Sequence, residues 1–325
     1  MSGPTIGLLG DVMLGRGVGE ALDPGHPEAV WSPALRELAA ECDAVVCNLE
    51  CCLSERGRPT RRVRGKPFFF RGPPAAVGAL GAIGVRVAGL ANNHALDFEV
   101  EALADTLDVL ADAGIATVGA GADAASARRA AVVDVDGSRL AVVAVSDHPP
   151  EYAAGGDEPG AAWADLWGGL PEWVVDELAR ARDAADRVVA FPHWGPNMSP
   201  RPGRWQRERA AELVAAGADL VAGHSAHVFH GVGRGPAAQP LLFDLGDAVD
   251  DYAIDPDLRN DLGLLALWRP DGEPDLELVG LHGRYAFTDL ARGAEADWIA
   301  RRLAKACGKL GTTVERTAEA RFALR

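Results

Sequence analysis

Apolar runs and amphipathic segments alternate along most of this chain. The runs expected to form buried strands occupy residues 5–9, 44–47, 85–90, 116–118, 140–145, 188–191, 220–222 and 241–244. Between them lie segments with the spacing of amphipathic helices, at residues 33–41, 74–83, 100–113, 172–184 and 206–216. Short apolar strands that alternate with helices are typical of a sheet whose two faces are both covered. The pattern therefore predicts a layered α/β fold with helices on both sheet faces.

Two segments depart from this alternation. After residue 262 the pattern predicts strands at 262–268 and 276–281 and a helix near 295–304, so residues 285–325 are expected to form a C-terminal helical extension. Residues 149–171 are rich in Gly, Pro, Ala and Trp, which predicts a long irregular loop. Loops of this length are usually functional or disordered, which makes this segment a candidate active-site loop. We expect one domain over residues 1–325.

Composition narrows the classes of partner. The chain has 325 residues, 48% of them hydrophobic, which is enough for a sizeable core. Its net charge of −15 argues against a nucleic-acid partner, because a phosphate backbone repels an acidic protein. No run approaches the roughly 18 apolar residues of a membrane span. We therefore expect no membrane partner and a cytoplasmic location, and the pattern predicts no particular oligomeric state.

The five cysteines are odd in number, and four of them lie within residues 42–52. They form neither a disulfide framework nor a zinc-binding C-x-x-C pair. Free thiols in a reducing compartment are the expected state.

Short polar signatures follow the ends of the predicted strands. They are GDVML (10–14), CNLE (47–50), ANNH (91–94), FPHWG (191–195) and AGHSAH (222–227), and they contain four of the eight histidines. In open α/β sheets, ligands bind at the carboxyl ends of the strands. The side chains in these signatures that suit a metal ion are Asp11, Glu50, Asn93, His94, His193, His224 and His227.

Each of these residues has a simpler explanation when it is taken alone. Asp11 is equally suited to cap the following helix, and an isolated histidine is more often a hydrogen-bonded polar group than a ligand. Several acids, amides and imidazoles at successive strand ends are hard to explain as separate caps. Imidazoles suit zinc, manganese and iron, and carboxylates can bridge two ions. The set therefore predicts a catalytic site for one or two divalent ions of Mn, Zn or Fe.

The order GDVMLGR, NLE, ANNHALD, HWG, GHSAH and a later LGD resembles the poly-γ-glutamate capsule synthesis (CapA) family, a branch of the calcineurin-like metallophosphoesterase superfamily. The resemblance covers about residues 5–250. It implies a four-layer α/β/β/α sandwich with a two-metal site at the strand ends. It also implies that Asp11 is a metal ligand, that Glu50 bridges the two ions, that Asn93 binds one ion, and that His94 is the general acid beside the leaving group.

The same resemblance implies roles for the later histidines. His193 and His224 would share one ion with Asn93, while His227 would join Asp11 on the other. The sequence also departs from the expected pattern. HWG is followed by Pro-Asn rather than closely by Glu, GHSAH takes the place of GHHPH, and DLGDA takes the place of SLGNF. The capsule proteins are typically membrane-anchored, and no anchor is expected here.

A further departure affects the metal site directly. Met13 stands where metallophosphoesterases carry a histidine two residues after the first Asp, so one ion lacks an imidazole ligand. Asp244 and Asp247 flank a glycine turn after another predicted strand and are candidates for orienting a ligand histidine.

Two residues are expected to take part in catalysis. An imidazole with an ordinary pKa near roughly 6.5 is suited to protonate a leaving group, which favours His94 as general acid. The alternative for His94 is support of the metal ligands. Arg16 lies only about a turn beyond Asp11 and is the best single candidate for binding an anionic substrate.

A basic segment at residues 56–71 is expected to recognise an anionic small-molecule or peptide substrate, through Arg62, Arg64 and Lys66. A solvated loop that pairs with surface acids is the alternative. His148 also follows a predicted strand, where it either lines the pocket or belongs to a turn beside two prolines.

These observations predict a metal-dependent hydrolase that uses a metal-activated water on a phosphoester, or on an amide of an acidic glutamyl-type peptide or polymer. One alternative is a non-hydrolytic binding or assembly protein of poly-γ-glutamate-type synthesis. The other is a tailoring enzyme that uses the same site for amide-bond chemistry. A poorly filled second metal site at Met13 would favour the alternatives.

Overall fold

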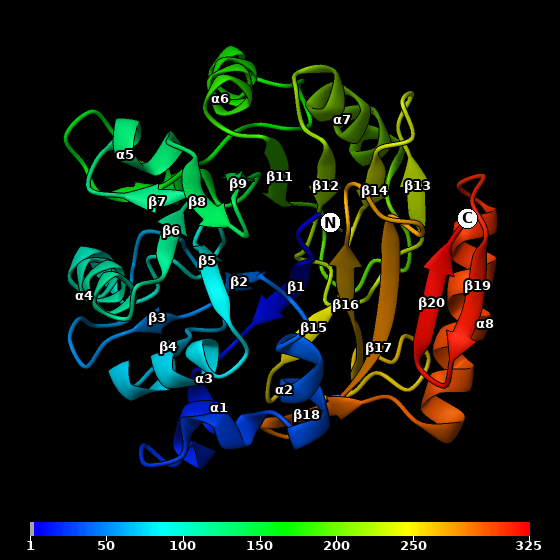
Figure 1. Ribbon diagram of the computed structural model, residues 1–325. Coiled ribbons are helices and arrows are strands. Elements are labelled where there is room, and N and C mark those ends of the chain that lie inside the picture. Colours follow the sequence, from blue (N-terminus) through cyan, green and yellow to red (C-terminus); the bar gives the residue numbers. More distant parts are fainter. Residues whose placement is uncertain (1–2) are drawn as a thin grey trace.

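The computed structural model describes residues 3–325 and is built from two β-sheets that pack face to face (Figure 1). Helices α3 and α4 cover the outer face of one sheet, and α6 and α7 cover the outer face of the other. The helices are α1 (Arg16–Ala21), α2 (Pro33–Ala39), α3 (Val77–Gly81), α4 (Glu99–Asp112), α5 (Ala124–Arg128), α6 (Glu172–Ala184), α7 (Arg204–Ala215) and α8 (Gly293–Gly308). Short 3-10 turns lie at Pro27–Val30, Pro74–Ala76 and Pro150–Tyr152.

The larger sheet has 10 strands in the order β19-β20-β17-β16-β1-β2-β5-β6, with β15 paired to β1 and β18 to β17. Its strands are β1 (Ile6–Val12), β2 (Ala44–Leu49), β5 (Val85–Gly89), β6 (Ala116–Val118), β15 (Asp247–Val249), β16 (Leu262–Trp268), β17 (Leu276–Arg284), β18 (Phe287–Leu290), β19 (Val314–Ala318) and β20 (Arg321–Leu324).

The smaller sheet has six strands in the order β13-β14-β12-β11-β9-β8. Its strands are β8 (Ala131–Val135), β9 (Ser138–Ser146), β11 (Arg187–His193), β12 (Leu220–Ala222), β13 (Val232–Arg234) and β14 (Pro240–Leu242). Two short pairs complete the strands, β3 (Cys52–Leu53) with β4 (Arg71–Gly72), and β7 (Ala120–Gly121) with β10 (Gly160–Ala161).

Three hydrophobic cores separate the four layers. Successive side chains of a strand point to opposite faces, so a strand buried on both faces needs a continuous apolar run. In β9, Val142 packs into the core between the sheets, and Val143 packs into the core under α6 and α7. In β1, Leu8 belongs to the central core and Leu9 to the core under α3 and α4. The predicted four-layer α/β/β/α sandwich is confirmed.

The predicted elements all have counterparts in the structure, and the main difference lies near the C-terminus. Residues 285–325 are only partly helical, because α8 is followed by β19 and β20, which extend the larger sheet. Most of β19 is exposed, so it carries no apolar run that would have predicted a strand. Residues 149–171 are mostly irregular but include a 3-10 turn and β10. Within residues 3–325, no helix is both long and apolar enough to cross a bilayer.

All five cysteines are free, as predicted. Burial raises the pKa of Cys52, which lies two residues after Glu50, to about 12. The buried thiols are therefore protonated at neutral pH and are not nucleophiles.

Candidate metal centre

The strand register brings the polar signatures together. In the larger sheet, Asp11 at the end of β1 lies beside Asn48 of β2 on one side and Asp247 of β15 on the other. In the smaller sheet, His193 at the end of β11 forms a bridge with His224, which follows β12. Both sets lie at the carboxyl ends of parallel strands. The two sheets thus contribute side chains to one site from facing edges.

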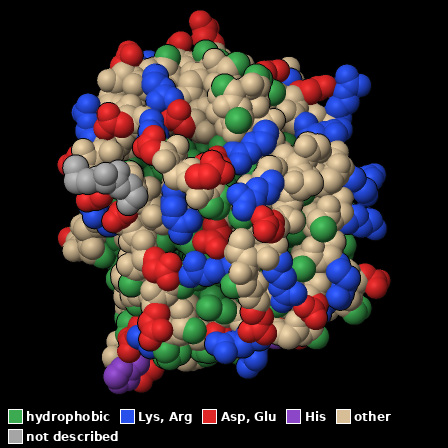
Figure 2. Space-filling view, turned by 45° about the vertical axis from the view of Figure 1, so that its right-hand side comes forward, with side chains coloured by type: hydrophobic (Ala, Val, Ile, Leu, Met, Phe, Trp, Pro, Cys, Tyr) green, Lys and Arg blue, Asp and Glu red, His purple; other side chains and the backbone are tan. Residues whose placement is uncertain are grey.

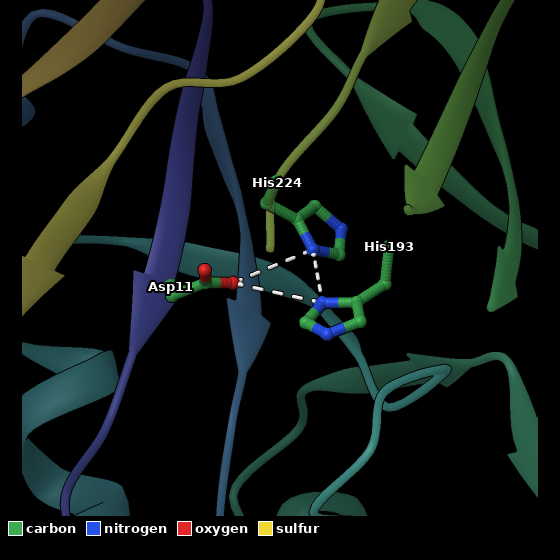
Figure 3. Close-up of side chains that lie close together, drawn as sticks. All are labelled: Asp11, His193 and His224. Atoms are coloured by element: carbon green, nitrogen blue, oxygen red, sulfur yellow. Dashed lines mark hydrogen bonds and ion pairs between the residues drawn. The ribbon is translucent and has the colours of Figure 1, made fainter. Parts of the chain in front are cut away.

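Three buried side chains from these strand ends point toward one another in Figure 3. Asp11 Oδ1 lies 3.4 Å from His224 Nδ1 and 3.9 Å from His193 Nδ1. Two donors that share an ion through bonds of about 2.0–2.2 Å at tetrahedral angles lie about 3.3–3.6 Å apart. The separations from Asp11 are therefore near the spacing that metal coordination requires. The two imidazoles are closer, with 2.8 Å between their Nδ1 atoms.

A second group shares Asp11 with the first. Asp11 Oδ2 lies 3.5 Å from His227 Nδ1, which is 2.8 Å from Asp247 Oδ1. From the sequence, Asp247 is expected only to orient a ligand histidine, but its carboxylate lies close enough to Asp11 and His227 to bind the same ion. Met13, in contrast, is buried and its Sδ accepts a hydrogen bond from the Gly15 amide at 3.1 Å. Asp247 is therefore a third possible ligand of the second group, alongside Asp11 and His227.

Glu50 and Asn93 border the first group. Glu50 Oε1 is 3.8 Å from His193 Nε2, and Asn93 Oδ1 is 3.0 Å from the same nitrogen. Tyr252 donates its hydroxyl proton to Glu50 Oε2 at 3.4 Å. Asn48 donates to Asp11 Oδ1 at 2.7 Å and fixes that carboxylate. The structure thus gathers the predicted ligands and adds a tyrosine and an asparagine that hold two of the carboxylates.

Several buried atoms of this cluster have no protein partner. Within residues 3–325, Glu50 Oε1, His224 Nε2 and Asp247 Oδ2 form no hydrogen bond. Leaving a buried polar atom unpaired costs about 1–3 kcal/mol, and more for a charged group. Buried acceptor atoms of carboxylates and imidazoles are the donor set that divalent Mn, Zn and Fe accept. The residues present therefore fit one or two divalent cations.

The two buried carboxylates shift in opposite directions. Burial, followed by the negative charge of Asp11, raises the pKa of Glu50 well above its ordinary value. Burial also raises the pKa of Asp11, but His224, His227 and the hydrogen bond from Asn48 outweigh it and lower the net pKa. A divalent cation among these groups would favour their charged forms.

The histidines divide into two kinds. Burial, and then the neighbouring His224, lowers the pKa of His193 well below its ordinary value, so its imidazole is neutral. Burial also opposes the charged form of His227, but the carboxylates of Asp247 and Glu50 outweigh it and raise its pKa well above the ordinary value. Neutral imidazole is the form that binds a metal ion.

His94 is held by a buried acid. Its Nδ1 lies 2.5 Å from Asp97 Oδ2, while its Nε2 lies 3.9 Å from Glu50 Oε1. Phe70 stacks on the imidazole at 3.8 Å between ring centroids. Burial lowers the pKa of His94 to about 4 although Asp97 opposes this shift. In the tautomer whose Nδ1–H donates a hydrogen bond to Asp97, Nε2 is unprotonated and faces the cluster.

A pocket of about 450 Å³ opens beside the cluster and shares Asn93, His94 and His227 with it. Arg16 and Lys66 also line it, together with the aromatic side chains Phe68, Phe70 and Tyr252.

The two cations of the pocket are fixed by acids. Arg16 binds Asp251 through Nε at 3.2 Å and a terminal nitrogen at 2.9 Å. Lys66 donates to the Asn93 carbonyl at 2.7 Å and pairs with Asp97 at 3.1 Å. Their placement suits a substrate that carries both negative charge and apolar groups.

Other predicted substrate residues lie outside this pocket. The Arg62 guanidinium pairs with Glu99 at 3.1 Å, and Arg64 is exposed. His148 contacts the Asp147 carboxylate, and its ring lies 5.2 Å from that of His193. None of these three predicted residues is part of the pocket lining. Arg62 thus follows the surface-pairing alternative, whereas Lys66 from the same segment reaches the pocket.

The turn that carries two of the histidines has an unusual backbone. Ser225 and His227 adopt positive φ angles of 111° and 57°, which non-glycine residues rarely adopt. The Ser225 amide donates to Asp11 Oδ2 at 3.1 Å, and the Ala226 amide donates to Asp244 Oδ2 at 2.7 Å. These contacts hold a strained turn in place, which is common at binding sites.

Comparison with known proteins places this geometry in a family. Residues 5–252 match the family described as Bacterial capsule synthesis protein PGA_cap. The chain is 33% identical over 305 residues to a probable polyglutamine synthesis accessory protein of Mycobacterium tuberculosis, across 76% of this chain and 74% of that protein. It is 28% identical over 235 residues to the capsule biosynthesis protein CapA of Bacillus anthracis, across 69% of this chain and 54% of that protein.

A solved structure supports the fold independently. A phosphatase from Mycoplasma pneumoniae aligns with a TM-score of 0.51 and 12% identity, over 90% of this chain and 94% of that chain. At this identity the likeness concerns the fold alone, which is the four-layer α/β/β/α sandwich. The match over residues 5–252 and the identity to the mycobacterial relative establish that the chain belongs to the bacterial capsule synthesis protein family PGA_cap.

Proposed function

We propose that this protein is a metal-dependent hydrolase that cleaves an amide bond in an acidic, glutamyl-type peptide or polymer. The observation that carries this proposal is the pocket that joins the metal cluster to two cations and an aromatic wall. A glutamyl chain offers carboxylates to the cations and methylene groups to the aromatic rings. The name of the mycobacterial relative refers to the synthesis of polyglutamine, which supports a substrate with amide bonds, and the two cations of the pocket are the reason to propose an acidic one.

The cluster offers two groups of ligands. Asp11, His193 and His224 would hold one divalent ion, and Asp11, His227 and Asp247 would hold a second. When bound, such ions would lower the pKa of a coordinated water and polarise the carbonyl of the substrate.

His94 would carry the proton in this reaction. Asp97 accepts a hydrogen bond from the Nδ1–H group of His94, so Nε2 is free to accept a proton from the attacking water. The same nitrogen would then pass that proton to the leaving nitrogen, which must be protonated to depart as an amine. Asp97 therefore acts as a positioning residue that sets the tautomer of His94. The sequence alone suggested a His94 with an ordinary pKa that acts as general acid. With its lowered pKa, His94 would instead be neutral at first, accept a proton as general base and then donate it as general acid.

Arg16 and Lys66 would position the substrate. Asp251 fixes the Arg16 guanidinium at two of its nitrogens and leaves its remaining N–H groups for a carboxylate. Arg16 also lies 5.2 Å from the ring centroid of Phe70, which is the ring that stacks on His94. A carboxylate held by Arg16 would thus lie close to the proton carrier.

One observation favours a second candidate function, which is a non-hydrolytic binding or assembly role in acidic-polymer synthesis. Met13 directs its sulfur to the Gly15 amide and provides no imidazole, so one ion would depend on Asp247. If that ion does not bind, the chain would keep the pocket and lose the hydrolytic reaction.

The two functions differ in metal content and turnover. Protein purified without a histidine tag would be subjected to elemental analysis and then incubated with a synthetic γ-linked glutamate decamer. We expect near two metal ions per chain and cleavage of the decamer. Both properties should be lost in Asp11→Ala and His193→Ala and kept in His26→Ala, whose side chain is exposed.

Other outcomes would contradict the proposed amide hydrolase. Bound metal without cleavage of the decamer or of any phosphoester would favour the binding role. Cleavage of a phosphoester and not of the decamer would assign the other substrate class that the sequence allows. Turnover that survives Asp11→Ala would contradict any reaction at this centre.

A further inference from the structure

A larger groove lies on the other side of the loop that follows His193. Its volume is about 1040 Å³, and it runs between the start of α7 and the second half of α8. Pro196 and Ser199 line this groove, while Asn197 and Met198 line the pocket beside the metal cluster. Residues 196–199 thus separate two neighbouring cavities.

The lining of the groove is strongly cationic. Seven Lys or Arg residues line it, and no Asp or Glu among residues 3–325 takes part. Arg301, Lys305 and Lys309 are four residues apart along α8, so they form one row with a rise of about 6 Å between neighbours. This concentration of positive charge is unexpected in a chain whose net charge is −15.

The cations of this row are free of protein partners. Within residues 3–325, Arg301, Lys305 and Lys309 form no ion pair and no side-chain hydrogen bond. Figure 2 shows a face of the molecule on which basic and acidic side chains lie next to one another. Arg316, near the C-terminus, pairs with Asp297 at 2.6 Å. The positive charges of the row on α8 are therefore not neutralised by neighbouring acids, unlike that of Arg316.

Aromatic side chains complete the groove. Trp167 and Trp205 stack with their ring centroids 4.7 Å apart. Arg302 lies 5.2 Å above the ring of Trp298 and donates to the Phe229 carbonyl at 3.1 Å. Single-stranded nucleic acid needs open aromatic faces for its bases, and these rings already have stacking partners. The stacked pair and the Arg302 contact reduce the aromatic surface that is left for bases.

We propose that this groove binds an extended acidic peptide chain. Alternate side chains of an extended peptide lie about 6.6 Å apart, close to the rise of about 6 Å between the cations on α8. The carboxylates would bind these cations, and the methylene groups would pack against the tryptophans. The groove is separate from the metal centre, and its occupation does not depend on hydrolysis there.

The row from Arg301 to Lys309 spans about 12 Å, which corresponds to about four residues of extended peptide. A fluorescein-labelled α-linked glutamate decamer is therefore long enough to fill the groove, and its binding can be followed by fluorescence polarisation. The measurement would be made in an Asp11→Ala background, so that no reaction at the metal centre removes the probe. Unlabelled diglutamate should compete poorly, because it reaches too few cations.

The test compares two triple variants with the same loss of charge. We expect Arg301→Ala, Lys305→Ala and Lys309→Ala together to weaken binding by about tenfold or more, from three exposed charge contacts. The matched control replaces Arg86, Arg129 and Arg139 by Ala, because these exposed arginines also form no ion pair within residues 3–325 and lie outside the groove. The control should bind within about twofold of the parent.

Several results would overturn the proposal. Equal weakening in both triple variants would mean that overall charge alone governs binding. Failure of the parent protein to bind the decamer would show that an acidic peptide is not the occupant. Tighter binding of polyphosphate or of single-stranded DNA than of the decamer would assign a different polyanion. In the otherwise wild-type protein, the groove variant should still cleave a short glutamyl amide that reaches only the metal pocket. This readout separates failure of the groove from failure of the proposed hydrolase.

Discussion

Asp97 does not belong to either group of candidate metal ligands, yet it organises the pocket. It accepts hydrogen bonds from the Phe70 amide at 2.6 Å and the Tyr152 hydroxyl at 3.0 Å, and it also holds His94 and Lys66. A buried carboxylate with this many partners is costly to alter, because each partner would lose a charged acceptor. The side chain therefore connects the proton carrier to the pocket wall.

Asp97→Asn should leave the metal content unchanged and lower turnover of the glutamate decamer by at least about tenfold. The amide has no negative charge and one acceptor oxygen, so it no longer enforces the Nδ1–H tautomer of His94. Asp105→Asn is the control, because Asp105 pairs with Arg56 on the surface of α4. Unchanged turnover in Asp97→Asn would contradict the role of Asp97 in positioning His94.

His230 is a buried imidazole outside the groups of candidate metal ligands, and it makes the stability of the protein depend on pH. Its Nε2 donates to the Ser199 carbonyl at 2.7 Å. Burial lowers the pKa of His230 from 6.5 to about 4. Because the unfolded chain binds the proton between these values and the folded chain does not, stability is retained above pH 6.5 and is lost as the pH falls toward 4.

His230→Gln should reduce this loss. The amide can still donate to Ser199 and does not titrate, so the free energy of unfolding should fall by about 3 kcal/mol less between pH 6.5 and 4 than in the parent. Urea unfolding at a series of pH values measures the difference. Parallel pH profiles for the two proteins would show that His230 is protonated equally in both states.

At the scale of elements, strand β1 must pass close to the turn before β15. A Cβ at Gly10 would lie 2.1 Å from the Gly246 carbonyl oxygen. This close approach allows the Asp11 amide to donate to the same carbonyl at 3.3 Å. The contact places Asp11 beside Asp247, so the shared carboxylate of the two candidate metal groups depends on the absence of a side chain at position 10.

Gly10→Ala should lower the free energy of unfolding by about 1–3 kcal/mol, because the strand and the turn must move apart. The same displacement should weaken metal binding, measured by calorimetric titration with Mn²⁺. Gly81→Ala is a suitable control, because a Cβ there meets no atom within 4 Å. Equal stability of Gly10→Ala and the parent would mean that the turn accommodates the methyl group without strain.

At the scale of the whole molecule, the site spans both sheets. Asp11 and Asp247 come from the larger sheet, whereas His193 and His224 follow strands of the smaller sheet. An ion that binds both sets would link the two halves of the sandwich. Binding to the folded state alone stabilises a protein in proportion to the logarithm of ligand concentration.

The Tm in the presence of a chelator should therefore be about 5 °C lower than the Tm measured with metal at near 100 times the Kd. Differential scanning calorimetry of the protein with and without added Mn²⁺ checks this expectation. Asp11→Asn should show the lower Tm in both conditions, because it weakens both groups of ligands. A Tm that does not respond to chelation would contradict binding across the two sheets.

The layers of the fold and most of the candidate site can be predicted from local patterns in the sequence. Continuous apolar runs report burial on both strand faces, and polar residues directly after such runs lie at the carboxyl edge whatever the details of packing. This is why Asp11, His193 and His224 could be predicted to lie together. The exposed strand β19 carries no such signal, since pairing with β20 rather than burial makes it a strand.

The partners of the charged side chains, in contrast, follow from the packing of distant segments. This packing brought Asp247 into the second group of candidate ligands, 236 positions after Asp11. It paired Arg62 with Glu99 and left the row on α8, which includes Lys305, without acids. Ion pairs and cavities depend on distances between segments far apart in the chain, and local hydrophobic patterns carry no information on those distances.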